Sequence, residues 1–339
     1  INEGRAFIYH GSVTGLSLTA NNTPDDADQA GAHFGISVAS AGDVNGDGYG
    51  DVIIGAYLFD DTFSDEGVAF VYHGSASGLS ATPNSMCDDA DQLNANFGIS
   101  VSSAGDVNGD GFSDVVIGAN SYDAVFANEG RAFVYHGSAV GLPATPNSTP
   151  DDANQLNANF GCSVASAGDV NGDGYSDVII GANSYDDVFA NEGRAFVYYG
   201  SAAGLPGTPD ITLDGANQLN AIFGNSVASA GDVNGDGYND VIVGAYQYDD
   251  GFVNEGLAFV YHGSAGGLSA TPNSILDDAD QVNAFFGVSV SAAGDINGDG
   301  YSDVIIGAYG YTDMGNVGEG RAFVYNGNDS TSNQRNNLR

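Results

Sequence analysis

The chain has 339 residues, of which 44 are acidic and only 6 are basic, and its formal net charge is −38 at pH 7. Contacts with phosphate groups depend on Lys and Arg, so this charge argues against nucleic acid and against an anionic membrane surface as partners. No apolar run approaches the roughly 20 residues of a membrane-spanning helix, which argues against membrane insertion. The 42% of apolar residues, with 18 Phe and 18 Tyr, indicate a folded chain with a large core.

A repeat of 63 residues dominates the sequence. The string Gly-Asp-Val/Ile-Asn-Gly-Asp-Gly begins at Gly42, Gly105, Gly168, Gly231 and Gly294. A Phe-Gly pair and a Glu-Gly-x-Ala-Phe string keep the same spacing, except that the last step of the second string is 64 residues. We therefore expect repeats at 34–96, 97–159, 160–222, 223–285 and 286–327, a half-unit at 1–33, and a polar tail at 328–339.

One unit, residues 97–159, predicts four strands in chain order. Residues 97–102 alternate large apolar with small side chains, which is the period of a strand. Residues 114–119 form a continuous β-branched run, as in a strand buried on both faces, and residues 131–136 form a third strand bounded by glycines. Residues 142–148 are a weaker fourth candidate, whose two prolines favour the edge of a sheet.

Four glycine-bounded strands in each unit, with no helical period, predict an all-β fold of four-stranded antiparallel blades. A single sheet of this kind would leave one apolar face in water, whereas blades stacked around an axis bury both faces. The sequence therefore predicts a β-propeller of five to seven blades. An open β-solenoid is the alternative, but solenoid coils usually have shorter periods.

Each complete unit carries an Asp-x-Asn-x-Asp-Gly-x-x-Asp loop between its first two strands. Side-chain oxygens at positions 1, 3, 5 and 9 and the carbonyl of position 7 are hard ligands that suit Ca²⁺, and glycine at position 6 permits the sharp turn. About five calcium ions are expected, one in each loop. The predicted ligand sets are Asp43, Asn45, Asp47, Tyr49, Asp51; Asp106, Asn108, Asp110, Phe112, Asp114; Asp169, Asn171, Asp173, Tyr175, Asp177; Asp232, Asn234, Asp236, Tyr238, Asp240; and Asp295, Asn297, Asp299, Tyr301, Asp303.

A plain Asn-Gly or Asp-Gly turn would explain the glycines of this loop but not three aspartates within nine residues. Two unit charges ~4 Å apart repel by about 1 kcal/mol in water and about 4 kcal/mol at an effective dielectric near 20. An EF-hand is excluded because Ile54 stands where the bidentate glutamate would be, and strands rather than helices flank the loop. The predicted role of the ion is therefore structural.

The order Phe-Gly, calcium loop, Ile-Ile-Gly-Ala resembles the FG-GAP repeat of integrin α-subunit β-propellers. The match is close at Phe286-Gly-Val-Ser-Val and at Asp303-Val-Ile-Ile-Gly-Ala-Tyr, and it covers residues 1 to about 327. The family's proline after Gly-Ala is Tyr or Asn here, and every complete copy carries a calcium loop, unlike integrins. The near-identical units resemble those of bacterial secreted proteins of this family.

The resemblance implies calcium loops on the lower face of the propeller and ligand binding on the upper face. The upper loops would then be acidic and aromatic, as in residues 57–65, and they are either solvated or a binding face for a cationic, cation-bridged or glycan partner. Their recurring residues are Tyr122, Tyr185, Tyr248 and Tyr311, with the pairs Asp25-Asp26, Asp88-Asp89, Asp151-Asp152 and Asp277-Asp278.

The predicted function is an extracellular or cell-surface adhesion or ligand-binding module that binds a protein or a glycan. The alternatives are a lectin and an accessory domain of an extracellular hydrolase. No catalytic role is expected, because the histidines recur one to a unit and no nucleophile elbow, phosphate loop or zinc motif occurs. The start at Ile1, inside a repeat and without a signal peptide, predicts a processed chain or a piece of a larger multidomain protein.

The ends of the chain leave ring closure open. The N-terminal half-unit supplies third and fourth strands, and the last unit ends after its third strand. Either the N-terminal fourth strand completes the last blade, which would leave residues 1–11 as a surplus strand, or the chain is part of a ring of six or seven blades. The unbalanced ends favour the second arrangement.

Overall fold

The computed structural model describes residues 3–25, 27–313 and 318–328. No residue in these ranges lies in a helix, and among them no helix is long and apolar enough to cross a membrane. The predicted tail, apart from Asn328, and the extra residue of the last loop near Gly315 lie outside the described residues.

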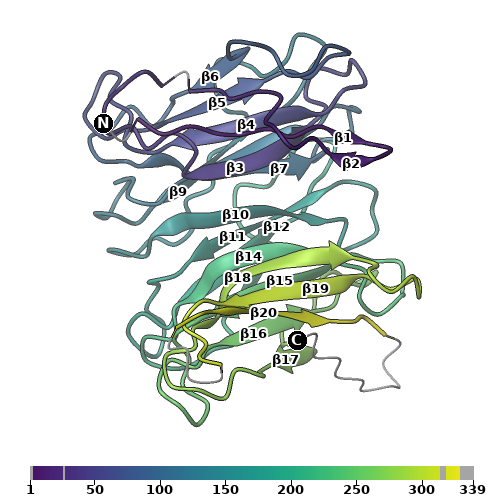
Figure 1. The fold of residues 1–339 in the computed structure, drawn as a ribbon. Helices are drawn as coiled ribbons and strands as arrows, with labels where there is room; N and C mark the ends of the chain where they lie inside the picture. The colour runs from purple at the N-terminus through teal and green to yellow at the C-terminus, as the bar shows by residue number, and fades with distance from the viewer. Residues whose placement is uncertain (1–2, 26, 314–317, 329–339) are drawn as a thin grey trace.

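The chain folds into five antiparallel sheets that follow one another along the sequence (Figure 1). This confirms the predicted all-β propeller and shows that it has five blades. A two-stranded hairpin, β1 (Gly11–Ser12) and β2 (Gly15–Leu16), precedes the five sheets. The sheets are β3 (Ser37–Gly42), β4 (Asp51–Ala56), β5 (Val68–Tyr72), β6 (Ser85–Cys87); β7 (Phe97–Gly105), β8 (Asp114–Ala119), β9 (Arg131–Tyr135); β10 (Phe160–Gly168), β11 (Asp177–Ala182), β12 (Arg194–Tyr198), β13 (Ile211–Leu213); β14 (Phe223–Gly231), β15 (Asp240–Ala245), β16 (Leu257–Tyr261), β17 (Ser274–Leu276); and β18 (Phe286–Gly294), β19 (Asp303–Ala308), β20 (Arg321–Tyr325).

The first three strands of the unit 97–159 lie where the sequence predicts them. The first is longer than expected and ends at Gly105, and the second has the predicted bounds. The prediction of the fourth strand at 142–148 is wrong for most of its length, because only Ser148 pairs, in an isolated bridge with Val134. In the first, third and fourth blades the fourth strand, for example Ile211–Leu213, falls at the end of this segment, after its prolines.

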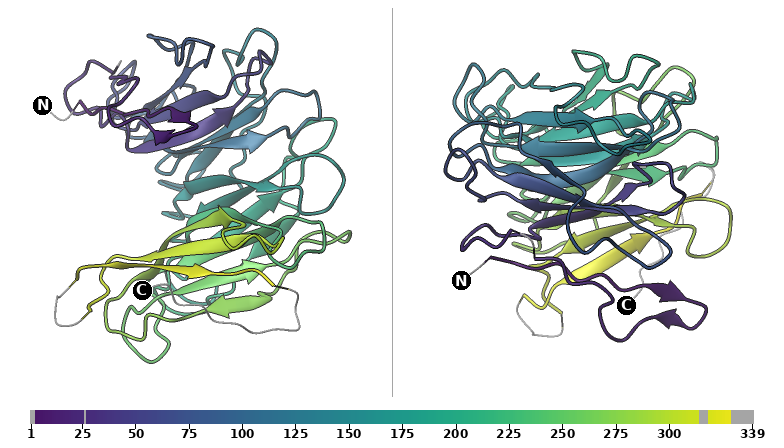
Figure 2. Two further views of the ribbon diagram at one scale, coloured as in Figure 1. Left: turned by 45° about the vertical axis from the view of Figure 1, so that its right-hand side comes forward. Right: turned by 90° about the horizontal axis from the view of Figure 1, so that it is seen from above.

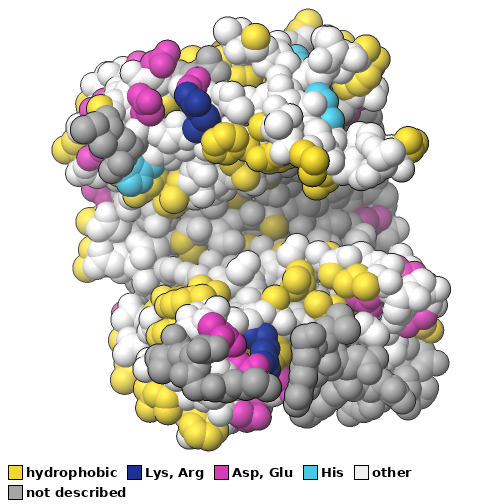
Figure 3. Space-filling model, in the orientation of Figure 1, with side chains coloured by type: hydrophobic (Ala, Val, Ile, Leu, Met, Phe, Trp, Pro, Cys, Tyr) yellow, Lys and Arg dark blue, Asp and Glu magenta, His cyan; other side chains and the backbone are white. Residues whose placement is uncertain are grey.

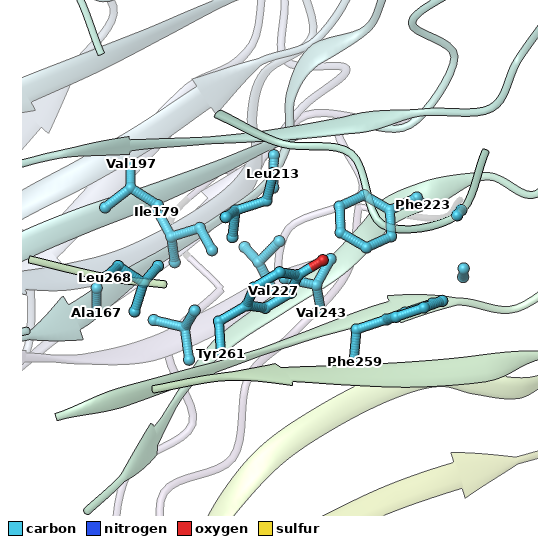
Figure 4. Packing of buried hydrophobic residues seen from close by; sticks show 14 of the residues in the cluster. Ala167, Ile179, Val197, Leu213, Phe223, Val227, Val243, Phe259, Tyr261 and Leu268 are labelled. Atoms are coloured by element: carbon cyan, nitrogen blue, oxygen red, sulfur yellow. The ribbon is translucent and has the colours of Figure 1, made fainter. Parts of the chain in front are cut away.

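The continuous apolar run of each second strand is explained by packing on both sides. In β11, Ile179 packs toward the fourth sheet, whereas Val178 and Ile180 pack toward the second sheet. The sheets approach so closely that a Cβ added at Gly55 would lie 1.9 Å from the carbonyl oxygen of Gly98 in the next sheet. Figure 4 shows one such interface, between the third and fourth sheets, with Ala167, Ile179, Val197, Leu213, Phe223, Val227, Val243, Phe259, Tyr261 and Leu268.

The first and last sheets lie at the two ends of an arc (Figure 2), and each has a face that no neighbouring sheet buries. Val38 of the first sheet is 57% exposed, but Val101 in the same position of the second sheet is 6% exposed. Ile305 of the last sheet is 37% exposed, but Ile242 in the fourth sheet is fully buried. Hydrophobic side chains line both facing rims in Figure 3.

The N-terminal segment packs against the first sheet rather than the last. Gly4 forms a parallel bridge with Phe34, Ile8 pairs with Asn22, and Ala6 is buried in the core of the first sheet. The alternative in which this segment completes the last blade is therefore wrong for this structure. Residues 4–24 occupy the places of a third and fourth strand, and a cavity of about 670 Å³ beside residues 5–8 lies where the inner strands of a blade would be.

Candidate metal centres

The five predicted calcium loops all lie at the same end of the blades. Each joins the first strand of a blade to the second, as residues 43–50 join β3 to β4. We call this the lower end, and we call the opposite end, where second strands finish and first strands begin, the upper end. The antiparallel order of the strands thus separates the candidate metal loops from the acidic and aromatic loops by the length of a blade.

Side-chain oxygens organise the backbone of the first loop. Asp43 Oδ1 accepts hydrogen bonds from the N–H groups of Gly46 at 2.7 Å and Asp47 at 3.1 Å, and its Oδ2 accepts one from Gly48 at 2.8 Å. Asn45 Oδ1 accepts the Asp47 N–H at 3.0 Å. The same bonds recur in the other four loops, so all five loops have one conformation.

The aspartate at the ninth position is the buried member of each set. Asp51 is 1% exposed, and its two carboxylate oxygens accept the N–H groups of Val44 at 2.9 Å and Gly74 at 2.8 Å. Burial raises the pKa of Asp114, its counterpart in the second blade, to about 7. This carboxylate ties the loop to the end of the third strand.

Each of the first four loops is also joined to the following blade. The Ser113 N–H donates to the carbonyl of Asp43 at 2.9 Å, and the Ser113 hydroxyl accepts the Asp43 N–H at 3.1 Å. Phe112, at position 7 of the second loop, packs over Gly46 so closely that a Cβ there would lie 2.5 Å from its ring. In the second to fifth loops the side chain of position 7 therefore fills the contact between blades, which leaves only its backbone carbonyl as a ligand.

The donor set fits a hard divalent cation. Carboxylate, amide and carbonyl oxygens are the ligands that Ca²⁺ takes in proteins, and each loop places them within nine residues. In the described residues, however, no three Asp, Glu, His or Cys side chains gather into a metal cage. Each predicted ligand set thus lies in one ordered loop. That these residues coordinate calcium stays a prediction.

At the upper end, a buried glutamate organises the loop between the second and third strands in each of the first four blades. Glu66 is 1% exposed and accepts the N–H groups of Thr62 at 3.0 Å and Phe63 at 2.8 Å. Burial raises the pKa of its carboxyl group. Sequence analysis showed that all six glutamates share this position but did not assign them this role, which depends on backbone groups that only the folded loop brings together.

Arginine side chains cover the recurring tyrosines in three blades. The guanidinium of Arg194 lies 4.4 Å from the ring centroid of Tyr185 and contacts Asp187 at 2.8 Å and Asp214 at 3.6 Å. Arg131 and Arg321 are placed in the same way over their own tyrosines and also pair with aspartates. Figure 3 shows basic side chains directly beside acidic ones. These tyrosines are therefore not free surfaces for a ligand.

Two blades lack this arginine. Leu257 stands in its place in the fourth blade, where Asp277 and Asp250 lie within hydrogen-bonding reach of each other. Burial, followed by the charges of Asp280 and Asp250, raises the pKa of Asp277. In the first blade Val68 replaces the arginine, and burial and neighbouring aspartates raise the pKa of Asp88. The upper ends of the first and fourth blades therefore keep their acidic groups but lack the arginine side chain that the other blades supply.

The second aspartate of the recurring Asp-Asp pairs has a structural partner. The Tyr135 hydroxyl donates to Asp89 at 2.6 Å, and the Tyr198 hydroxyl donates to Asp152 at 2.8 Å. The Tyr325 hydroxyl donates to Asp278 at 2.6 Å in the same way. None of the three described pairs is therefore wholly solvated, and Asp26 lies outside the described residues. Tyr261 has no such partner, because Gly215 occupies the aspartate's position.

Comparison with known proteins agrees with this architecture. The model of the FG-GAP repeat matches residues 34–72, 97–135, 160–198, 223–261 and 286–325, which together make up more than half of the chain. The chain belongs to the FG-GAP repeat family. Among curated relatives, integrin alpha-5 of Xenopus laevis is 35% identical over 179 residues, and integrin alpha-V of Gallus gallus is 34% identical over 215 residues.

The extent of these similarities differs between the relatives and the solved structures. The matches cover 50% and 61% of this chain but only 16% and 19% of the two integrin chains, so the FG-GAP chain spans less than a fifth of their length. The solved structure of Saccharomyces cerevisiae Sqt1 superimposes with a TM-score of 0.52 at 13% identity, covering 97% of this chain and 70% of that chain. At such low identity the likeness concerns the fold alone.

Proposed function

We propose that this chain is the ligand-binding propeller of an extracellular or cell-surface adhesion protein, stabilised by calcium and without catalytic activity of its own. The observation that carries the proposal is the loop at the lower end, which has the same hydrogen-bond network in all five blades. Membership of a family with integrin α chains supports a role in binding protein ligands.

Calcium would act here as a link between blades. Each loop holds its own backbone and the third strand of its blade through hydrogen bonds, and the first four loops are also bonded to the next blade. A divalent ion within the loop would neutralise carboxylates that otherwise repel one another, and it would bind only when the loop is folded. Five such ions would reduce the formal charge from −38 to −28, since five times two charges are added.

The ligand would bind at the upper end, where acidic groups remain uncompensated. In the fourth blade Asp250 and Asp277 lie together beside Tyr248, and Leu257 supplies no positive charge. In the third blade the equivalent aspartates hold Arg194. A basic side chain from a protein partner would complete the fourth blade in the way that Arg194 completes the third.

Removal of calcium tests the stabilising role. A ligand that binds only the folded state stabilises it by RT ln(1 + [L]/Kd), about 2.7 kcal/mol for each site at a concentration of 100 Kd. Excess chelator should therefore lower the melting temperature by many degrees, as followed by circular dichroism, and added calcium should restore it. A melting curve that is identical with and without chelator would rule out structural calcium.

A further inference from the structure

The loop between the first two strands of the last blade is packed differently from its four counterparts. A Cβ added at Gly46, the fourth position of the first loop, would lie 2.5 Å from the ring of Phe112 in the next blade, and the second, third and fourth loops are covered in the same way. A Cβ added at Gly298, the equivalent glycine of the last loop, would meet no described atom within 4 Å. The last sheet lies at one end of the arc (Figure 2), so no described blade covers its loop.

Two backbone hydrogen bonds also reach each of the first four loops from the next blade. In the first loop the carbonyl of Asp43 accepts the Ser113 N–H at 2.9 Å, and the carbonyl of Val44 accepts the Ser138 N–H at 3.0 Å. Both bonds recur in the second, third and fourth loops, but the fifth loop has neither among the described residues. Asn297, at the third position of the fifth loop, is exposed, whereas the asparagines at the same position of the other loops are only partly exposed: Asn45, Asn108, Asn171 and Asn234.

Within the loop, the fifth copy keeps the hydrogen bonds of the others. The Gly298 N–H donates to Asp295 Oδ1 at 2.7 Å, which is the distance found in the first loop. Asn297 Oδ1 accepts the Asp299 N–H at 2.8 Å. The first six residues of the five loops are also identical, except that Ile296 replaces a valine. The contacts of a following blade are therefore what distinguishes the first four loops from the fifth.

The third and fourth positions of each loop form an Asn-Gly pair. Asparagine is a thermolabile residue, and glycine after it offers no side chain that would hinder a reaction with the backbone. The glycine nitrogen attacks the asparagine Cγ atom, the bond from Cγ to the side-chain nitrogen breaks, and ammonia leaves with the proton that the glycine nitrogen gives up to solvent. Water then opens the five-membered imide at one of its two carbonyl carbons, so the product is aspartate or isoaspartate.

The folded loop opposes this reaction. The N–H of Gly298 is held by a carboxylate, and the side-chain oxygen of Asn297 is held by a backbone N–H, so the nitrogen can turn toward Cγ only when the loop opens. Local opening is easiest where the fewest contacts break. The first four loops must also release two hydrogen bonds and an aromatic ring of the next blade, whereas the fifth loop opens without this cost.

We propose that Asn297 is the site at which this protein spontaneously deamidates, and that the next blade protects the four equivalent asparagines. The chain has a sixth Asn-Gly pair at Asn326, but it is tightly packed, since a Cβ added at Gly327 would lie 2.3 Å from the carbonyl oxygen of Ser302. The inference goes beyond the proposed function, because it concerns a covalent change of the chain and requires neither a ligand nor calcium. Isoaspartate adds one atom to the backbone, so the last loop would no longer match the other four.

Peptide mapping by mass spectrometry measures the reaction in all five loops at once. The glutamates recur at one position of the repeat, so cleavage after glutamate places each loop in a separate peptide. In folded protein, incubated at mildly alkaline pH below its melting temperature, we expect Asn297 to deamidate at least about tenfold faster than the other four, because two fewer hydrogen bonds hold its loop. In urea all five should react at one rate. Equal rates in the folded protein, or a faster reaction of Asn297 in urea as well, would overturn the proposal.

The repeat also supplies a variant that uncovers a protected loop. Phe112→Ala removes the ring over Gly46 and should accelerate deamidation of Asn45 but not of Asn108. Tyr49→Ala is the matched control, since Tyr49 has the same position in the first loop, which no other loop of this kind precedes. Circular dichroism checks that both variants are folded. An unchanged rate at Asn45 in Phe112→Ala, or the same acceleration in Tyr49→Ala, would show that the next blade does not protect the loop.

Discussion

The lower and upper ends of the same blades differ in how much they vary from repeat to repeat. The calcium loops repeat one hydrogen-bond network five times, and their ninth aspartate is buried in every blade. The upper end changes from blade to blade: an arginine is replaced by Val68 and Leu257, and asparagine by Ile222 and Phe285. Uniformity indicates a structural demand that every blade shares, whereas variation indicates positions that are free to acquire a ligand.

Removal of one buried aspartate at the lower end should have the largest effect. Asp177→Ala leaves the buried N–H groups of Val170 and Gly200 without an acceptor, which costs about 3 kcal/mol of unfolding free energy, and it removes a calcium ligand. Urea denaturation, with and without calcium, measures both losses.

Asp152→Ala is the control for this variant at the upper end of the same region. It removes only the bond from the Tyr198 hydroxyl, so the expected cost is about 1 kcal/mol and should not depend on calcium. Equal losses in the two variants, or a calcium-dependent loss in Asp152→Ala, would contradict the division of roles between the two ends.

The sequence predicts the parts of this fold that depend on local pattern. The run at 114–119 indicates a buried strand because its apolar residues face two sheets, and the loop spacing follows from the ligands that a cation needs. The fourth strand is harder to predict, because Ile211–Leu213 has only three residues and a weak apolar pattern. The pairing of Arg194 with Asp214 joins different strands, so it becomes visible only when the blade is folded.

A smaller effect is expected where an arginine is restored at the upper end. Leu257→Arg should place a guanidinium between Asp250 and Asp277 and over Tyr248, as Arg194 lies over Tyr185. The gain in unfolding free energy should be about 0.5–1 kcal/mol, since the ion pairs are partly exposed. The pKa of Asp277, raised in the parent protein, should fall, and NMR titration of its carboxyl group measures the change.

The same variant separates structure from binding at the fourth blade. If a basic side chain of a partner binds there, Leu257→Arg blocks it while leaving calcium binding unchanged. An unaltered pKa of Asp277, or a protein that is less stable than the parent, would show that the two aspartates are not arranged to receive a cation.

Calcium stoichiometry tests the central claim most directly. Isothermal titration of metal-free protein with calcium should show about five bound ions in a chain with five loops, and about four in Asp169→Ala, which removes the first ligand of one loop. Zinc and copper, which prefer nitrogen and sulfur ligands, should not compete at the same concentrations. Absence of calcium binding, or an unchanged stoichiometry in Asp169→Ala, would contradict the assignment of the five loops as metal centres.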